Sequence, residues 1–597
     1  MPIIIKRPIF QVPIEATLRL AHFYSVMRNI KESANFIWGI ADLLRGDYKQ
    51  SDYGKVILPL TILRRLDCVL EKTKPEVLAR YEQVKTMNIQ NLDPILDKVA
   101  GYRFHNHSQF TFDKLIADPS NIAANLRNYI NGFSDESREI IEQFEFDNQI
   151  TKMDEANLLF MVVKRFQEID LHPEAISSLE MGYMFEELIR KFAEISNETA
   201  GEHFTPREVI RLMVNLLFLN DREILTKKGI IKNIYDCCAG TGGMLSVAEE
   251  YVRELNPDAT LLVFGQELNP ESYAICKSDM LIKGQSASNI KKGNSISEDK
   301  LADEKFDYLI TNPPFGVKWQ KIEKQVRDEH DKKGHGGRFG AGLPSVSDGS
   351  FLFLMHLISK MKHEGARLAI VFNGSPLFSG SPSGTKNESS IRQWIIENDM
   401  LEAIIALPNQ LFYNTGISTY IWIISNNKPA KRKGKVQLIN AVDLYKKMSK
   451  SLGDKRNELS EEHIANITQL YGAFQANEYC KIFDNKDFGY SKVTVERPEM
   501  KNGKPVLDKH GKPKPDSSLR DTENIPLKED IQAYIKREVL PHVPDAWVDE
   551  SKTNIGYEIN FTKYFYQYKP LRSLDEIRRD ILALEQETEG LIKEVIA

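Results

Sequence analysis

The stretch that decides the fold is residues 306–316, which read FDYLITNPPFG. Its mostly apolar beginning, Phe306 to Ile310, is followed closely by Asn312-Pro313-Pro314-Phe315. A short apolar run that ends in turn residues predicts a buried strand that leads into a loop. Proline has a fixed φ and no N–H, so this loop is stiff and presents carbonyl oxygens. Because ligands of open α/β sheets bind beyond the carboxyl ends of the strands, we expect a binding site here.

A stiff loop with acceptors and an aromatic ring suits the binding of a planar group that carries an NH2. The exocyclic amine of a base is a poor nucleophile, because its lone pair is delocalised into the ring. Hydrogen bonds from the amine to the Asn312 side-chain oxygen and the Pro313 carbonyl shift the nitrogen toward tetrahedral geometry, while Phe315 stacks on the base. Preorganised dipoles of this kind stabilise a transition state selectively. The tetrapeptide alone leaves open an ordinary proline-rich turn.

Two further apolar strands are predicted upstream, and both end in residues typical of cofactor binding. Ile230 to Tyr235 leads into the glycine-rich turn Asp236 to Gly243, DCCAGTGG, after which a helical pattern begins. Leu261 to Gly265 leads into Gln266-Glu267, and an acidic residue there is the expected partner of ribose hydroxyls. The turn is neither a dinucleotide fingerprint nor a P-loop. A glycine turn, an acidic strand end and a catalytic loop, in this order, indicate an S-adenosylmethionine (AdoMet) methyltransferase.

Several segments resemble the amino-methyltransferases that modify DNA adenine at N6, and more narrowly the modification subunits of type I restriction–modification systems. The residues that carry this resemblance are 201–207 (GEHFTPR), 236–243 (DCCAGTGG), 267–270 (ELNP) and 311–316 (TNPPFG), and two terminal segments, 37–46 and 524–549, are also similar to that family. The resemblance implies an α/β fold: a Rossmann-like AdoMet-dependent methyltransferase sheet with an N-terminal helical domain and a C-terminal helical tail.

The resemblance also implies roles for single residues of this chain. The implied catalytic residues are Asn312, Pro313, Pro314 and Phe315. The implied AdoMet-binding residues are Glu202, His203, Phe204, Thr205, Pro206, Arg207, Asp236, Gly240, Thr241, Gly242, Gly243, Glu267 and Asn294. Relatives often carry Gly-Asp where this chain has Gly293-Asn294, and asparagine accepts hydrogen bonds without contributing a charge. No metal ion is expected.

The segment at residues 204–208, FTPRE, is predicted to start a helix. Thr205 is predicted to be a helix N-cap, Pro206 suits the first helical position, and Glu208 completes a capping box. The positive end of that helix and its unpaired N–H groups are suited to the carboxylate of AdoMet. A well-capped helix without a binding role is the alternative.

Composition indicates a multidomain protein with real hydrophobic cores. The chain has 597 residues, 42% of them hydrophobic, with a net charge of -5 and a pI near 6.3. This negative net charge argues against a protein that binds DNA over a large surface without a partner. A local basic groove or a partner subunit is therefore expected. The five cysteines lack metal-ligand spacing. The adjacent Cys237 and Cys238 suggest either a redox pair or, more simply, two small apolar side chains on a buried strand.

The chain is predicted to have four parts. They are a helical domain at 1–170, the methyltransferase domain at 171–450, a polar extension with an exposed loop at 451–572, and a heptad helix at 573–597. The loop of the extension is expected at residues 497–520. Residues 319–349 are predicted to be either a mobile loop that closes over a flipped base and touches phosphates, or a solvated surface loop.

The last segment is predicted to pack along a partner helix. Ser573 and Glu576 form a capping box, and apolar residues then alternate at spacings of three and four: Leu574, Ile577, Ile581, Leu584, Leu591 and Val595. Packing on the chain's own domain is the alternative. The resemblance favours a partner, because modification subunits assemble as two copies around one specificity subunit, and that complex recruits restriction subunits.

The predicted function is the transfer of a methyl group from AdoMet to N6 of adenine in a specific sequence of double-stranded DNA. The adenine must leave the duplex, because its N6 lies inside a base pair. Three alternatives stay open: a methyltransferase of the same fold that acts on a protein glutamine, one that acts on guanine N2 of ribosomal RNA, and a scaffold without activity. The sequence shows no signal peptide and no long apolar stretch, so we expect a cytoplasmic protein without membrane contact.

Overall fold

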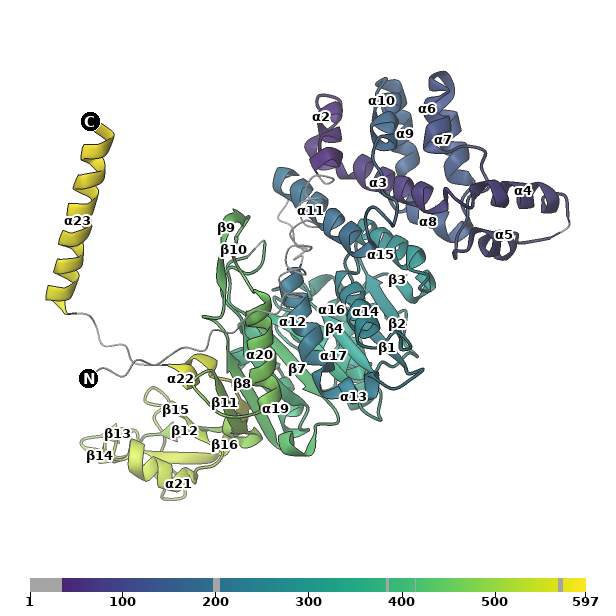
Figure 1. Ribbon diagram of the computed structural model, residues 1–597. Coiled ribbons are helices and arrows are strands. Elements are labelled where there is room, and N and C mark those ends of the chain that lie inside the picture. Colours follow the sequence, from purple (N-terminus) through teal and green to yellow (C-terminus); the bar gives the residue numbers. More distant parts are fainter. Residues whose placement is uncertain are drawn as a thin grey trace. The chain divides into compact units, whose positions relative to one another are not determined.

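The computed structural model describes residues 35–87, 89–196, 205–382, 386–413, 415–566 and 573–596. The chain divides into a large compact unit that ends at Ile559 and a small unit that begins at Asn560. Figure 1 labels their helices and strands. In the part of the chain that is described, no helix is both long enough and apolar enough to cross a membrane.

The first part of the large unit is helical, as predicted. Its described α-helices are α2 (Ile40–Leu44), α3 (Gly54–Leu70), α4 (Lys74–Val84), α5 (Asp93–Ala100), α6 (Phe112–Ile116), α7 (Ile122–Asn131), α8 (Asp135–Glu142), α9 (Phe146–Glu155), α10 (Leu159–Gln167) and α11 (Ser178–Ser196). α3 is buried on nearly every side. It contacts α9, α10 and α11 and also α15 (Pro270–Ile282), so it joins the helical part to the sheet that follows.

The central sheet holds nine strands among the described residues, in the order β11-β8-β6-β7-β5-β4-β1-β2-β3. The strands are β1 (Ile231–Asp236), β2 (Thr260–Glu267), β3 (Ile290–Lys292), β4 (Tyr308–Thr311), β5 (Arg367–Asn373), β6 (Leu401–Ala406), β7 (Thr419–Ser425), β8 (Lys435–Asn440) and β11 (Cys480–Asp484). β3, β2, β1, β4 and β5 run parallel, whereas β7 runs antiparallel to β5 and β6. The three strands predicted from apolar runs at 230–235, 261–265 and 306–310 are present as β1, β2 and β4, with bounds that agree within two residues.

The order of the strands positions the candidate site. β2 and β3 lie on one side of β1, whereas β4 and β5 lie on the other, so the connections change direction between β1 and β4. Such a switch point opens a crevice at the carboxyl ends of the strands. Tyr235 pairs with Leu309, and this register brings the end of β1, with its glycine turn, beside the end of β4, with its Asn-Pro-Pro-Phe loop.

Helices pack against the central sheet (Figure 1). α12 and α14 contact each other and both touch the sheet. The described α-helices of the sheet-bearing part are α12 (Arg207–Phe218), α13 (Arg222–Leu225), α14 (Gly243–Leu255), α15, α16 (Glu323–Lys333), α17 (Ser350–Ser359), α18 (Ser375–Phe378), α19 (Glu388–Glu397) and α20 (Glu461–Ala473).

The predicted capping box at residues 205–208 is wrong. α12 begins at Arg207, Pro206 occupies the capping position, and no side chain caps this helix. The Thr205 hydroxyl instead accepts a hydrogen bond from Asn312, and Glu208 forms an ion pair with Lys455. Both side chains are engaged in long-range contacts that a local sequence pattern does not reveal.

Residues 319–349, predicted to be a loop, form a packed segment around α16. Arg338 pairs with Glu329 at 2.7 Å and donates to the carbonyl oxygens of Ser295 and Ile296 at 3.1 and 2.8 Å. Phe339 is fully buried. Arg338 therefore anchors this segment to the turn after β3.

The sheet continues past residue 450, where the sequence predicted the end of the methyltransferase domain. β9 (Lys446–Leu452) and β10 (Lys455–Glu458) form a hairpin across that position. After α20, β11 pairs with β8 and thus still belongs to the central sheet. The sheet-bearing part therefore extends to Asp484.

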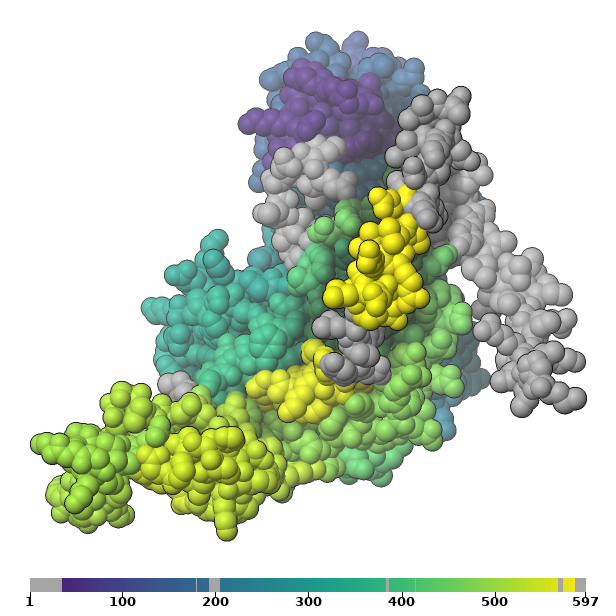
Figure 2. Space-filling view, turned by 90° about the vertical axis from the view of Figure 1, so that its left-hand side faces the viewer, coloured from purple at the N-terminus to yellow at the C-terminus, as the bar shows by residue number. Residues whose placement is uncertain are grey.

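A second, smaller sheet of the large unit follows, with strand order β15-β12-β16. Its elements are β12 (Gly489–Glu496), β15 (Asp521–Pro526), α21 (Ile531–Tyr534) and β16 (Trp547–Tyr557), and its core is Val493, Val495, Ile525, Ile535 and Val539. Residues 497–520 are exposed almost throughout, as predicted, and include the short hairpin of β13 (Met500–Lys501) and β14 (Lys504–Pro505). Figure 2 shows this lobe at its lower left.

The small unit contains α22 (Phe561–Phe565) and α23 (Leu574–Ile596). The predicted capping box of α23 is confirmed, because Glu576 N donates to Ser573 Oγ at 3.3 Å and Ser573 N donates to Glu576 Oε2 at 3.0 Å. The apolar side chains of its first turns are exposed, from 39% at Ile577 to 84% at Leu574. α23 thus presents the apolar seam that the heptad spacing predicted.

Candidate active site

One cavity of about 540 Å³ lies at the carboxyl ends of β1, β2 and β4. Its volume is within the range of roughly 300–1,000 Å³ that is usual for small-molecule pockets. Each of the three strands contributes the residue at or just after its end: Asp236 from β1, Glu267 from β2 and Asn312 from β4. The crevice expected from the strand order is therefore present and is large enough for a ligand.

Most of the predicted site residues line this cavity. Those that do are Thr205, Asp236, Gly240, Thr241, Gly243, Glu267, Asn294, Asn312 and Pro314. Those that lie beside it without lining it are Pro206, Arg207, Gly242, Pro313 and Phe315. The remaining three, Glu202, His203 and Phe204, lie outside the described residues.

The buried carboxyl group of Asp236 joins the ends of β1 and β4. Its Oδ1 accepts hydrogen bonds from the Thr311 hydroxyl at 2.7 Å and from the Cys238 amide at 2.9 Å. Only 1% of this residue is exposed, and burial raises the pKa of its carboxyl to about 7, although both hydrogen bonds act in the opposite direction. Asp236 thus fixes the glycine turn relative to the catalytic loop.

The glycine turn is held by the carboxylate of Glu267. One carboxylate oxygen accepts from Gly240 N at 2.7 Å, and the other accepts from Asn269 N at 2.7 Å. Gly240 has φ +53° and only open space where a Cβ would be, so its backbone faces the cavity. A Cβ at Gly242, which has φ +84°, would lie 2.8 Å from Cys276 Sγ. Gly242 therefore allows α15 to pack closely against the turn.

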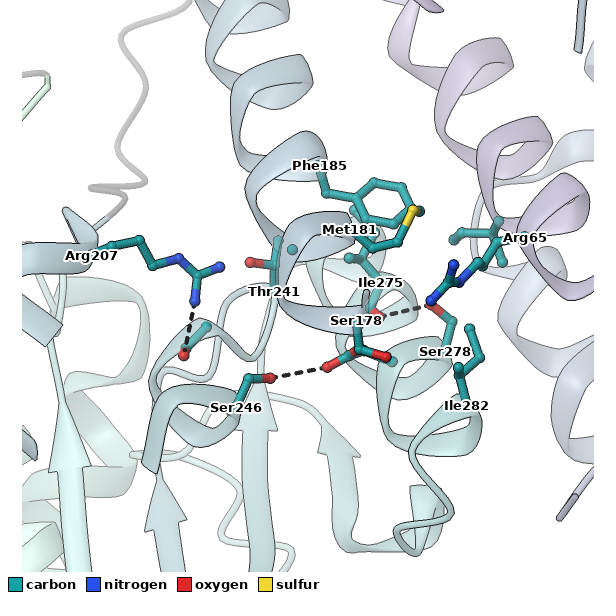
Figure 3. Close-up of a pocket in the computed structure, with 14 residues that line it drawn as sticks. Arg65, Ser178, Met181, Phe185, Arg207, Thr241, Ser246, Ile275, Ser278 and Ile282 are labelled. Carbon is teal, nitrogen blue, oxygen red and sulfur yellow. Dashed lines mark hydrogen bonds between the residues drawn. The ribbon is translucent and has the colours of Figure 1, made fainter. Parts of the chain in front are cut away.

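The segment before α12 packs against the catalytic loop and the glycine turn. Asn312 Nδ2 donates to Thr205 Oγ1 at 2.8 Å, which fixes the orientation of the Asn312 amide. Arg207 pairs with Glu186 at 2.6 Å and donates to the Gly243 carbonyl at 3.2 Å, as Figure 3 shows for the second contact. Arg207 lines a second, smaller cavity and is not among the residues that line the main one.

The catalytic loop is well packed. Asn312 is 9% exposed, and Pro313 is buried. The half-buried ring of Phe315 meets the ring of Phe412 edge to face, with 6.0 Å between their centroids and an interplanar angle of 73°. Asn294, which also lines the cavity, accepts from Ile296 N at 2.9 Å and Ser297 N at 3.2 Å, so its oxygen stabilises the turn after β3.

The family model of the N-6 DNA methylases matches residues 177–502, which is more than half of the chain. The chain belongs to the N-6 DNA methylase family. A second family model, that of the HsdM N-terminal domain, matches residues 33–166. The predicted fold class is thereby confirmed, and so is the expectation of an adenine-specific DNA methyltransferase.

Proteins similar to this chain include type I restriction enzyme methylase subunits. The type I restriction enzyme MjaIX methylase subunit of Methanocaldococcus jannaschii is 28% identical over 79% of this chain and 82% of its own length. The HindI methylase subunit of Haemophilus influenzae is 27% identical over 63% of this chain and 79% of its own length. The crystal structure of a type I restriction–modification methyltransferase subunit from Streptococcus thermophilus shares the fold, with a TM-score of 0.61, 24% identity and coverage of 77% of this chain and 97% of that one.

Several residues of the methylase's cavity were not predicted. They include Glu186 from α11, Ile210 from α12, Ser272 from α15 and Phe353 from α17. No sequence motif distinguishes them: Ile210 and Phe353 fit the apolar patterns of their helices, and Glu186 and Ser272 are single polar residues within theirs. Asn269 and Pro270 also line the cavity, and the ELNP segment that carried the resemblance contains both.

The adjacent cysteines lie in the turn after β1, where Cys237 is buried and Cys238 is half-buried. Cys237 Sγ and Cys238 Sγ are 3.9 Å apart and form no disulfide bond. The hydrogen bond with Cys237 and burial raise the pKa of the Cys238 thiol well above its usual value. A reactive cysteine requires a stabilised thiolate, so this environment favours the interpretation as small apolar residues over a redox pair. Within the described ranges no cluster of side chains is arranged to hold a metal ion.

The raised pKa of Asp236 predicts a pH dependence of stability in the methylase without ligand. An aspartate in an unfolded chain has a pKa near 4, so the folded state holds this proton more tightly. Its contribution is therefore favourable at low pH and is lost as pH rises from about 4 through about 7. Asp236→Asn keeps an acceptor for Thr311 and Cys238 but does not ionise. The melting temperature of the variant minus that of the wild type should increase by several degrees between pH 5 and pH 8.

Differential scanning fluorimetry at a series of pH values measures this difference. The exposed Asp303 provides the control, and Asp303→Asn should shift the melting temperature equally at all pH values. If the melting temperatures of Asp236→Asn and wild type differ by a constant amount over this pH range, the raised pKa of Asp236 is contradicted.

Proposed function

We propose that this chain is the methylation subunit of a type I restriction–modification complex, and that its cavity brings AdoMet and a flipped adenine of a specific DNA sequence together. The observation that carries the proposal is the hydrogen bond from Asn312 Nδ2 to Thr205 Oγ1. It fixes the amide of the catalytic loop within a cavity that the glycine turn also lines. The family match supports DNA adenine as the substrate over a protein glutamine or ribosomal RNA.

The residues of the cavity fit AdoMet. The open space at Gly240 allows a ligand to approach the backbone, and Glu267 lies at the strand end where ribose hydroxyls are bound in related sheets. The Glu267 carboxylate has about four acceptor positions, and the backbone N–H groups of Gly240, Leu268 and Asn269 use three of them, so one remains for a hydroxyl. AdoMet supplies a methyl group that its sulfonium charge activates. Asn294 faces the cavity from the turn after β3 and offers a neutral contact to the adenine ring of AdoMet.

The catalytic loop is proposed to act on the exocyclic amine alone. Because Nδ2 of Asn312 donates to Thr205, its amide oxygen is oriented as an acceptor for the amine. The Pro313 carbonyl provides the second acceptor, and Phe315 stacks on the base that has left the duplex. The edge-to-face contact with Phe412 fixes the ring of Phe315 in place. These residues are in position before the reaction, so little reorganisation is needed when charge develops.

Asn312→Ala tests this mechanism. It should leave AdoMet binding nearly unchanged and lower the rate of methyl transfer about a hundredfold or more, because loss of one preorganised contact is worth on the order of 3 kcal/mol. Radiolabelled AdoMet and duplex DNA measure the transfer, and calorimetry measures the binding. Thr205→Val should give a smaller loss of rate, since the amide remains but is no longer held.

Asn398→Ala is the matched control, because Asn398 is exposed and only donates to the Trp394 carbonyl of its own helix. It should match wild type in both assays. Full turnover by Asn312→Ala would remove this residue from the mechanism.

The proposed partners are one specificity subunit, shared by two methylation subunits, and restriction subunits that join the complex. The apolar seam of α23 supports such an assembly: Leu574, Ile577, Ile581 and Leu584 are between 39% and 84% exposed. Burial of such side chains contributes roughly 1.5–3 kcal/mol each before ordering costs. A helix with this seam is suited to a partner helix.

A chain that ends at Pro570 tests this assembly. The large unit ends at Ile559, so the shortened chain should stay folded and bind AdoMet like the full chain. It should fail to form a complex with the specificity subunit in co-expression and gel filtration, and should lose sequence-specific methylation. Ile577→Asp with Ile581→Asp should have the same effect, whereas Arg578→Ala should not. Normal assembly of the shortened chain would refute the role of α23 and place the partner contact on another part of the chain.

A further inference from the structure

The hairpin of β9 and β10 carries a concentration of positive charge in a chain whose net charge is negative. Residues 445–458 contain five Lys and Arg against two Asp and Glu. Four of these cations are exposed: Lys446, Lys447, Lys450 and Arg456. Lys446 lies 4.0 Å from Glu458, a weak surface pair that leaves most of the charge of the hairpin uncompensated. Figure 1 shows the two strands projecting from the central sheet as a separate ribbon.

The fifth cation, Lys455, fixes the base of this hairpin. It is 3% exposed, and its Nζ donates to Glu208, to the Leu411 carbonyl at 2.9 Å and to the Asn457 carbonyl at 2.9 Å. An ammonium group has three protons, so all of its donors are used. Glu208 belongs to the first turn of α12, and Leu411 to the loop after β6. One buried side chain therefore ties the hairpin to two elements beside the active site.

The same loop connects the hairpin to the catalytic residues. Arg456 N donates to the Gln410 carbonyl at 2.9 Å, and Asp454 N donates to the Tyr413 carbonyl at 2.8 Å. Phe412, between these two positions, contacts the ring of Phe315. Gly453 has φ +60°, and a Cβ there would lie 2.5 Å from the Tyr413 carbonyl oxygen, so only glycine fits this close approach. The hairpin is thus anchored one contact away from the residue proposed to stack on the adenine.

We propose that the β9–β10 hairpin binds the sugar–phosphate backbone of the substrate DNA beside the flipped adenine. The proposal rests on the proposed function, which brings DNA to the catalytic loop. Successive side chains of a strand point to opposite faces, so Lys446 and Lys450 lie on one face of the ribbon and Lys447 on the other. The major groove of DNA admits a two-stranded ribbon and has phosphates along both walls. Contacts of this kind position the duplex and do not read its sequence.

A second basic hairpin provides the matched control. Residues 497–520 contain seven Lys and Arg against three Asp and Glu, and Lys501 and Lys504 are exposed in it. Its backbone hydrogen bonds stay within its own segment, for instance from Val506 N to the Glu499 carbonyl at 2.8 Å and from Lys514 N to the Val506 carbonyl at 2.8 Å. It resembles the β9–β10 hairpin in charge and differs from it in having none of these bonds to the catalytic region.

The experiment compares the triple variant K446Q/K447Q/K450Q with the control K501Q/K504Q/K509Q, which removes the same number of charges from exposed lysines, each assembled with the specificity subunit. The triple variant should raise the KM for DNA about tenfold or more, with kcat nearly unchanged, and AdoMet affinity should equal that of wild type. The slope of log K against log salt should become shallower by about 0.9 for each lost phosphate contact. The control variant should keep the KM and the slope of wild type.

The outcomes separate this inference from the proposed function. A wild-type complex that transfers no methyl group to DNA refutes the function itself. A triple variant with the salt slope and KM of wild type refutes the hairpin contact while leaving the function intact. Equal losses in the triple variant and in the control refute it as well, because they indicate a general effect of net charge rather than a contact beside the active site.

Discussion

The site depends on a buried hydrogen bond, 2.7 Å long, from the Thr311 hydroxyl to the Asp236 carboxyl. β1 and β4 are neighbours only because the strand order changes direction between them. The bond connects the two strand ends, so the glycine turn after Asp236 and the catalytic loop after Thr311 keep a fixed separation. A buried carboxyl group is costly unless it is hydrogen-bonded, and the raised pKa of Asp236 reflects that cost. The cavity therefore has its shape before any ligand binds.

Local patterns in the sequence were enough to predict β1, β2 and β4 and the position of the site. Apolar runs that end in turn residues place strand ends reliably, and parallel strands bring their carboxyl ends to one edge. Asp236, Glu267 and Asn312 were predicted on that basis and line one cavity. The same patterns did not predict where polar side chains are engaged by distant segments. Thr205 was expected to cap a helix, and its hydroxyl instead binds Asn312, more than a hundred residues away.

Two further differences have the same physical origin. The charged, glycine-rich composition of residues 319–349 suggested a loop, but Arg338 finds its acceptors at Glu329 and at the turn after β3, and this buried network orders the segment. Lys455 gave no sequence signal, because its partner Glu208 precedes it by almost 250 residues. Helix and strand propensities act over a few residues, whereas these contacts depend on the complete topology. The anchoring of the β9–β10 hairpin beside the catalytic loop therefore does not follow from local sequence patterns.

The central claim is that this site activates the N6 amine of adenine in DNA. The most direct measurement is mass spectrometry of nucleosides from DNA that was incubated with the assembled complex and deuterated AdoMet. The account predicts N6-methyladenine as the labelled nucleoside. Label in N4-methylcytosine, or in the protein fraction with none in DNA, would contradict it.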